Sequence, residues 1–141
     1  MLNITYNPTL KKEKQLEYQE FRKLFLHEEK EHKGLIRLFI NRLEEKGIIT
    51  NGIYSHKQDN YLAKLICYMQ HENIIKKDCN YISLARCFYG FFKKDVAEKA
   101  GENIVTISNV RKTLRDGFEG LSNEEKNDFA LICSVFISRR E

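Results

Sequence analysis

The sequence predicts an all-α fold of six to seven helices, with at most one very small β-hairpin near residues 48–54. Three observations support this prediction. The 141 residues contain one proline and seven glycines, so few positions interrupt helices. Apolar residues recur at helical spacing along most of the chain. Hydrophobic residues make up 42% and charged residues 31% of the composition, which is typical of a globular domain that builds a core without disulfides.

Two amphipathic helices are expected in the N-terminal part of the chain. The first spans residues 8–33 and begins at Asn7-Pro8, a capping residue followed by proline at the first helical position. The second spans residues 35–46 and ends at Gly47, where a glycine suits a C-terminal cap. Asn51-Gly52 between two short apolar runs then predicts the hairpin turn. The apolar face of the first helix consists of Tyr18, Phe21, Leu24 and Phe25.

Further helices are expected over residues 57–73, 81–92, 104–115 and 123–139. Capping-box patterns precede the first and last of them, at Ser55-x-x-Gln58 and Ser122-x-x-Glu125. Segment 81–92 is apolar on most sides, so we expect it in the centre of the core, including the aromatic run 87–92. Segment 93–101 has helix-forming composition. We therefore expect an N-terminal helical region, 1–55, and a helical domain, 56–141, joined in one compact unit.

The sequence lacks the patterns of most catalytic and metal sites. His27 and His32 are five residues apart, whereas a zinc-protease motif needs histidines four apart on one helix face. The four cysteines form no close pairs of the kind that bind zinc, and we interpret them as reduced thiols. Phosphate-loop, dinucleotide and nucleophile-elbow motifs do not occur. We therefore predict no enzyme activity, no metal and no cofactor. With no signal peptide and no apolar stretch long enough for a bilayer, we expect a cytoplasmic protein without a membrane partner.

One segment, residues 93–112, meets the requirements of a helix-turn-helix unit. Ala97 stands where two helices would cross, Gly101 stands in the turn, and Ile107 and Val110 stand at the packing positions of the second helix. The segment resembles the DNA-binding part of LacI-type repressors. The residues that carry the resemblance are Asp95-Val96-Ala97, Ala100-Gly101, Thr106 and Ser108, with Ile107 in place of valine.

A second pattern extends over a longer stretch, about 58–140. It consists of Leu65-Ile66, Leu84-Ala-Arg-x-Phe88 with Phe91-Phe92, and Thr106-x-x-x-Val110-Arg111. In this pattern the chain resembles the C-terminal domain of the RteC family, regulators of excision genes in conjugative transposons. This resemblance implies that 81–92 is the first helix of a helix-turn-helix or winged-helix-like unit, and that 93–102 is an elaborated turn. The two resemblances place the first helix differently, and both alternatives stay open at this point.

Both resemblances make 104–115 the recognition helix. Its apolar side, Ile104, Ile107, Val110 and Leu114, is expected to face inward. From 103 to 115 there are three basic residues and no acidic one. The expected DNA contacts are a phosphate at the capping Asn103 and the first-turn amides, base edges at Thr106, Ser108 and Asn109, and phosphates or a guanine at Arg111, Lys112 and Arg115. Val105 is expected to face outward with them, and Lys93 and Lys94 are expected to anchor the flanking DNA backbone.

The predicted function is a small DNA-binding transcriptional regulator that recognises duplex DNA, with a mobile element as the source that the RteC resemblance implies. A homodimer would suit two half-sites about 34 Å apart. The alternative is a helical module that binds another protein and no nucleic acid. A concentrated positive face around Arg111 and Lys112 favours the first function. An exposed apolar groove beside residues 8–46, with Arg111 in an intramolecular salt bridge, favours the second.

Overall fold

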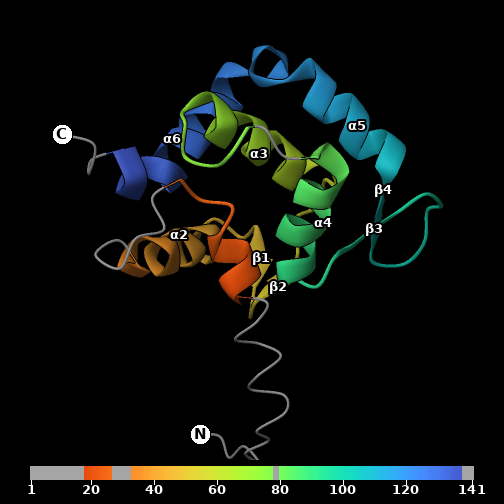
Figure 1. Cartoon of the computed structure of the whole chain (residues 1–141), viewed down its shortest axis with the longest axis horizontal. Helices are drawn as coiled ribbons and strands as arrows, with labels where there is room; N and C mark the ends of the chain where they lie inside the picture. The colour runs from red at the N-terminus through yellow and green to blue at the C-terminus, as the bar shows by residue number, and fades with distance from the viewer. Residues whose placement is uncertain (1–17, 27–32, 78–79, 138–141) are drawn as a thin grey trace, which may run out of the picture.

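The computed structural model describes residues 18–26, 33–77 and 80–137, and this part of the chain is predominantly helical (Figure 1). Residues 18–22 are helical. The longer helices are α2 (Lys33–Glu45), α3 (Tyr61–His71), α4 (Tyr81–Phe91), α5 (Ile107–Asp116) and α6 (Asn123–Ile137), and η2 (Phe118–Gly120) is a short 3₁₀ helix. The strands are β1 (Ile49–Thr50), β2 (Ile53–Tyr54), β3 (Asp95–Ala97) and β4 (Ile104–Thr106). The predominantly helical character is confirmed.

The predicted hairpin near 48–54 is present. Strands β1 and β2 pair antiparallel, with Ile49 opposite Tyr54. The two turn residues, Asn51 and Gly52, both have positive φ, 54° and 80°. Asparagine and glycine tolerate this conformation best, and it matches the twist of the flanking strands. Ile49 and Tyr54 are buried, so the hairpin contributes one face to the core.

The first predicted helix ends earlier than expected. Residues 18–22 are helical, but Phe25 forms an isolated antiparallel bridge with Ile75. The amide of Leu26 donates to the carbonyl of Ile74 at 2.9 Å, which directs the backbone away from helical pairing. The prediction of a helix through residue 33 is therefore wrong at this point, while its ranges 8–17 and 27–32 lie outside the described residues. Phe21 and Phe25 are fully buried, as the apolar stripe predicts.

Only one of the two predicted capping boxes forms. At α6 the amide of Glu125 donates to the Ser122 hydroxyl at 3.1 Å, and the amide of Ser122 donates to the Glu125 carboxylate at 2.9 Å. At α3 the prediction is wrong. The Ser55 hydroxyl shares a hydrogen bond with Thr50 at 2.8 Å, next to the hairpin, and α3 begins at Tyr61.

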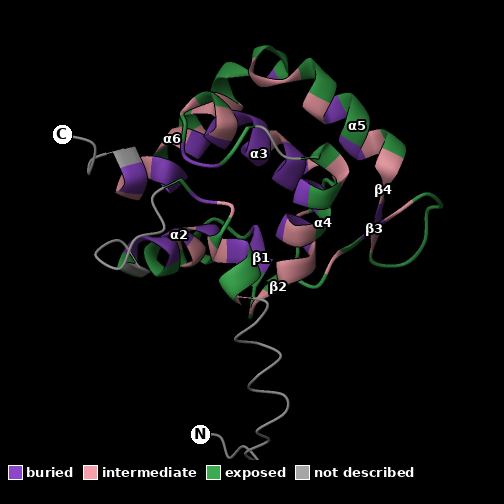
Figure 2. Ribbon diagram, viewed as in Figure 1, coloured by how far each residue is buried: buried purple, intermediate pink, exposed green. Residues whose placement is uncertain are grey.

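A single cluster of buried hydrophobic residues extends from Phe21 to Phe136 and includes residues from both predicted regions, 1–55 and 56–141. Helix α4 contributes the fully buried Phe88 and Tyr89 to this cluster, but it also has half-buried and exposed residues (Figure 2), so it is less completely buried than the sequence predicts. Helix α3, with eight buried residues, is the more deeply buried of the two. Helix α2 packs against α6, and α3 packs against both α5 and α6. The aromatic run 87–92 thus belongs to the core, as expected. Every helix in the described part of the chain is too short or too polar to cross a lipid bilayer.

Segment 93–101, which one alternative made a helix and the other part of an elaborated turn, contains strand β3 and is not helical. The chain leaves α4 through Lys93, whose φ is 65°, and β3 then pairs parallel with β4 across loop 98–103. Val96 and Val105, opposite each other in this sheet, are both buried. The strand alternation therefore brings two valines to the core. Consequently Ala97 and Gly101 do not mark a helix crossing and its turn, and the helix that precedes α5 is α4.

Candidate nucleic-acid interface

Helix α5 is the second helix of the predicted binding unit, and it is shorter than the predicted span 104–115. It begins after Thr106, whose hydroxyl accepts the amide of Asn109 at 3.2 Å. Residues 104–106 form strand β4. Asn103 is therefore not the cap: its φ is 62°, and its side-chain amide donates to the carbonyl of Lys93 at 2.6 Å. Asn103 does not form the expected phosphate site, because it lies before strand β4 and not at the start of α5. In addition, the Thr106 hydroxyl already accepts one of the first-turn amides of α5.

The inward side of α5 differs from the predicted one in two ways. Val110 is fully buried as expected, but Ile104, Ile107 and Leu114 are only partly buried. Val105, expected to face outward, has an exposed fraction of 0%. It lies in β4, where successive side chains point to opposite faces, and so it does not follow the helical period used for the prediction.

Thr113 is a buried polar residue that fixes α5 on α3, and the sequence analysis missed it. Its hydroxyl donates to the Asn109 carbonyl at 3.0 Å and accepts the Asn60 side-chain amide at 3.1 Å. The Cys67 thiol donates to the Thr113 carbonyl at 3.5 Å. The sequence contained one signal for this role: Thr113 follows Val110 by three residues, so the two side chains lie on the same side of the helix. The bonds to Asn60 and Cys67 fix how α5 is rotated about its own axis. This rotation sets which residues of α5 face solvent.

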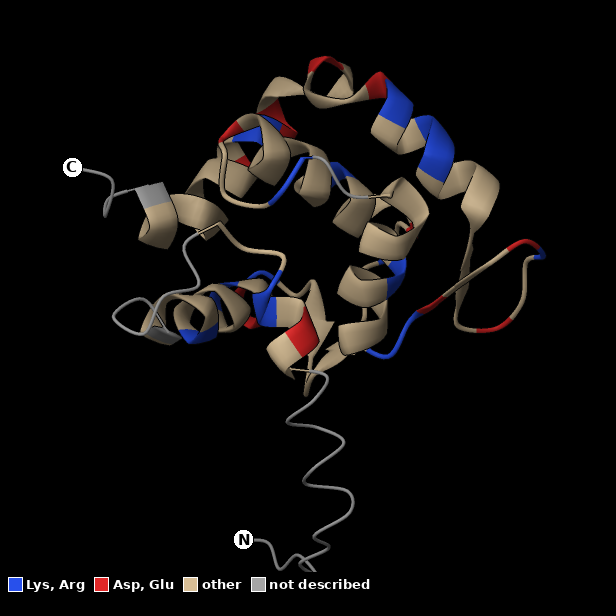
Figure 3. Ribbon diagram, viewed as in Figure 1, with Lys and Arg blue, Asp and Glu red and all other residues tan. Residues whose placement is uncertain are grey.

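The outward face of α5 is basic. At 100° per residue, four positions fall within an arc of about 100° on the side opposite Val110 and Thr113. All four are exposed: Ser108, Arg111, Lys112 and Arg115. Within the described residues, no carboxylate forms an ion pair with any of the three cations. Figure 3 shows these basic segments along α5, at the periphery of the molecule. Three uncompensated charges on one helix face produce a local positive potential.

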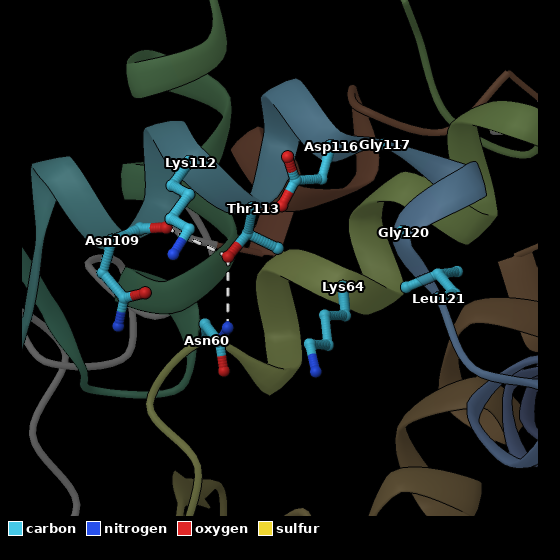
Figure 4. A pocket seen from close by; sticks show the side chains of 9 residues that line it. All are labelled: Asn60, Lys64, Asn109, Lys112, Thr113, Asp116, Gly117, Gly120 and Leu121. Atoms are coloured by element: carbon cyan, nitrogen blue, oxygen red, sulfur yellow. Dashed lines mark hydrogen bonds between the residues drawn. The ribbon is translucent and has the colours of Figure 1, made fainter.

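Asn109 lies at the edge of this face and lines a polar hollow between α5, α3 and η2 (Figure 4). The hollow has a volume of about 260 Å³, and both Lys112 and Lys64 extend into it. The Lys64 ammonium binds the Glu125 carboxylate at 2.7 Å, and Asp116 also lines the hollow. The carboxylate of Glu125 thus compensates Lys64, whereas Lys112 borders both the hollow and the outward face of α5.

The two other predicted lysines lie away from α5. Lys94 forms an ion pair with Asp59 at 3.1 Å, and its side chain is only 11% exposed. It is not placed to anchor DNA, contrary to the prediction. Lys93 is exposed, in the turn between α4 and β3. This basic turn is well separated from the basic segments of α5 in Figure 3.

Of the nine predicted residues, the structure therefore groups four on one exposed face: Ser108, Arg111, Lys112 and Arg115. Thr106 and Asn109 border this face, because one caps the helix and the other turns toward α3. Lys93, Lys94 and Asn103 belong to the loop region before α5. The exposed basic face of α5 is thus smaller than the predicted set of nine residues.

The histidine, cysteine and acidic side chains of the described residues are dispersed. No three of their histidine, cysteine, aspartate and glutamate side chains come together in a way that could hold a metal ion. Cys67 and Cys133 are buried. Burial raises the pKa of the Cys67 thiol to about 11 and that of Cys133 further still, so both are protonated at neutral pH. A protonated thiol is a poor nucleophile and a poor metal ligand.

No family model, curated protein or solved structure matches this chain.

Proposed function

We propose that this chain is a small DNA-binding regulator that inserts α5 into the major groove of duplex DNA. The single observation that carries the proposal is the exposed face of Arg111, Lys112 and Arg115, which have no carboxylate partner among the described residues. An α-helix fits the major groove, and arginine and lysine bind phosphates and the guanine edge. An intramolecular salt bridge at Arg111 would have favoured the protein-binding alternative.

The position of α5 in the chain also supports the proposal. Helix α4 packs directly against α5, and residues 92–106 connect the two as a long turn that contains the β3–β4 pair. Helix-turn-helix proteins also present the second of two packed helices, the recognition helix, on their surface. In this arrangement Ser108 and Arg111, near the start of α5, would meet base edges, while Lys112 and Arg115 would meet phosphates. Regulation of a mobile element, and binding as a homodimer, extend the same proposal.

The test is fluorescence anisotropy with a labelled duplex of about two helical turns, roughly 21 base pairs. Titrations run from about 50 to 200 mM salt, where phosphate contacts weaken steeply. We expect Arg111→Ala/Lys112→Ala to lower affinity roughly tenfold or more at the lowest salt, and to reduce the slope of log affinity against log salt by about 1 to 2.

The matched control is Arg37→Ala/Lys46→Ala, which removes the same charge from one exposed position on α2 and one in the turn that follows it. It should bind within roughly twofold of wild type, because α2 lies on the side of the molecule away from α5 (Figure 1). Equal affinity of wild type and the α5 variant would overturn the assignment of α5. Absence of wild-type binding at about 50 mM salt, where phosphate contacts are strongest, would overturn DNA binding altogether.

A helical protein-binding module is the second candidate, and a specific surface favours it. A mainly apolar hollow of about 400 Å³ is lined by Tyr18, Ile40, Ile53, Phe91 and Phe92 together with the hairpin turn. Ile53 is 49% exposed at its rim. This candidate predicts that Ile53→Asp abolishes binding of a protein partner, whereas the Arg111/Lys112 variant leaves it intact.

A further inference from the structure

The polar hollow between α5, α3 and η2 contains two charged groups without an ion-pair partner. It has a volume of about 260 Å³ and adjoins the outward face of α5 (Figure 4). Lys112 and Asp116 line it, about one helical turn apart on α5. Within the described residues neither of them forms an ion pair, whereas Lys64 is compensated by Glu125 at 2.7 Å. The hollow therefore presents one ammonium and one carboxylate that are available to a ligand.

The local structure around the hollow keeps these two charges apart. A lysine that precedes an acidic residue by four positions is in the less favourable order for pairing on a helix. Gly117, with a φ of 64°, ends α5 and turns the chain into η2. A Cβ at Gly120 would lie 2.8 Å from the β-carbon of Asp116, so the backbone of η2 packs directly against Asp116. Two glycines thus form a wall without side chains, and the space beside the two charges stays open.

Two asparagines add hydrogen-bonding groups to the hollow. The buried Thr113 hydroxyl accepts the side-chain amide of Asn60 at 3.1 Å, which fixes Asn60 and leaves its side-chain oxygen for another donor. The side chain of Asn109 also lines the hollow and forms no hydrogen bond within the described residues. Asn109 lies three residues before Lys112, and Thr113 lies three residues before Asp116, so each charge has an amide group on its side of the helix.

We propose that this hollow binds a free α-amino acid with a small polar side chain. The Lys112 ammonium and the Asn109 amide bind its carboxylate, and the Asp116 carboxylate and the Asn60 oxygen bind its ammonium. A zwitterion satisfies both charges of the hollow, whereas a ligand of one sign leaves the other charge without a partner. Pockets for drug-sized molecules measure roughly 300–1,000 Å³, so a hollow of about 260 Å³ suits a smaller ligand.

Occupancy of the hollow also affects the duplex, and this part of the inference rests on the proposed function. Lys112 is one of the three cations that α5 presents to DNA. A bound carboxylate neutralises Lys112 and holds it in the hollow, so the complex with DNA loses about one phosphate contact. By linkage, DNA weakens the binding of the amino acid by the same factor. The amino acid thus acts as an effector that releases DNA.

Isothermal titration calorimetry of the full chain, without DNA, tests the site with three probes that differ by one charged group. L-Serine has both charges, 3-hydroxypropanoate lacks the ammonium, and ethanolamine lacks the carboxylate. We expect L-serine to bind at least roughly tenfold more tightly than either of the others, because each of these leaves one charge of the hollow unpaired. Absence of L-serine binding up to about 10 mM, or equal binding of the three probes, would overturn the site.

Asp116→Asn tests the half of the site that binds the ammonium. It should weaken the binding of L-serine roughly tenfold or more, but it should not weaken that of 3-hydroxypropanoate, which has no ammonium. The matched control, Glu44→Gln, removes one carboxylate from an exposed position of α2 and should bind all three probes like wild type. L-Serine binding that is unchanged in Asp116→Asn would contradict the assignment.

The anisotropy assay, with and without about 10 mM L-serine, then tests the effect on DNA at about 50 mM salt. We expect L-serine to lower the DNA affinity of wild type roughly threefold or more and that of Asp116→Asn by less than roughly twofold. If L-serine binds but leaves the DNA affinity of wild type unchanged, the effector role is wrong and the site stands. If wild type binds no DNA, the proposed function fails, whereas calorimetry still decides the amino-acid site.

Discussion

At the scale of single residues, a few side-chain oxygens determine where helices begin. Asn80 accepts the amides of Ile82 and Ser83 at the start of α4, and Thr106 and Ser122 cap α5 and α6. The same pattern at Ser55 does not cap, because its hydroxyl bonds to Thr50 of the hairpin. A capping pattern thus shows only that a side chain is able to cap. The competing partner is set by tertiary structure.

Thr113 yields a prediction at this scale. Thr113→Val keeps the shape of the side chain but removes the hydroxyl that bonds to Asn60 and to the Asn109 carbonyl. We expect the free energy of unfolding, measured by urea denaturation, to fall by about 1 kcal/mol, because the half-buried amide of Asn60 loses its acceptor. The control is Thr50→Val, which removes a hydroxyl that also forms a hydrogen bond, to Ser55, but at an exposed position where water can replace it. It should change the free energy of unfolding by less than about 0.5 kcal/mol. Equal costs for the two variants would contradict the role of Thr113.

At the scale of elements, the segment after α4 shows how tertiary contacts override helix propensity. Its composition favours a helix, yet it forms β3, because pairing with β4 buries Val96 and Val105. The exposed side of α5 was predictable, since Arg111, Lys112 and Arg115 follow the helical period. The positions of Asn103 and Lys94 were not predictable from the sequence. The positive φ of Asn103 and the ion pair of Lys94 with Asp59 both depend on the folded chain.

The N-terminal cap of α4 provides the prediction at this scale. Asn80→Ala removes the oxygen that accepts two amides, so the free energy of unfolding should fall by about 1 kcal/mol. Asn127→Ala, at an exposed interior position of α6, is the matched control and should be neutral or slightly stabilising, because alanine favours helices. Thermal or urea unfolding followed by circular dichroism measures both. A neutral Asn80 variant would show that the cap contributes nothing.

At the scale of the whole molecule, one aromatic-rich core joins segments far apart in the sequence. The Phe21 ring stacks on the Phe91 ring with 4.3 Å between their centroids, and it contacts Phe88 edge-on at a centroid distance of 5.0 Å. The rings of Phe136 in α6 and Phe39 in α2 have centroids 5.5 Å apart. Such pairs add to the stabilisation from burial alone. The chain termini of the described part thereby contribute to the same core, and α5 is presented at its periphery.

This core predicts a loss of stability in alkaline solution. Burial raises the pKa of the Cys67 thiol to about 11 and that of the Tyr61 hydroxyl to about 12, and it raises those of Tyr54, Tyr89 and Cys133 as well. In the unfolded chain, thiols release their protons near pH 8.5 and tyrosines near pH 10. The unfolded state therefore binds fewer protons above pH 8.5, and the free energy of unfolding decreases as pH rises.

We expect urea denaturation to show a decrease of about 2 kcal/mol or more between pH 8.5 and pH 10.5. Cys67→Ala should remove part of this decrease, because alanine has no proton to lose, although the variant starts from a lower stability. A free energy of unfolding that stays constant over this range in wild type would show that these groups are not protected from solvent.

The sequence by itself determined the helical class, the hairpin, the core aromatics and the basic character of residues 103–115. These features follow from local periodicity, turn chemistry and composition, which act over a few residues. Only the tertiary structure decided that 95–97 pairs with 104–106, that Val105 is buried, and that Lys94 pairs with Asp59. Those outcomes depend on contacts between residues distant along the chain, such as Asn60 with Thr113, and no local pattern encodes them.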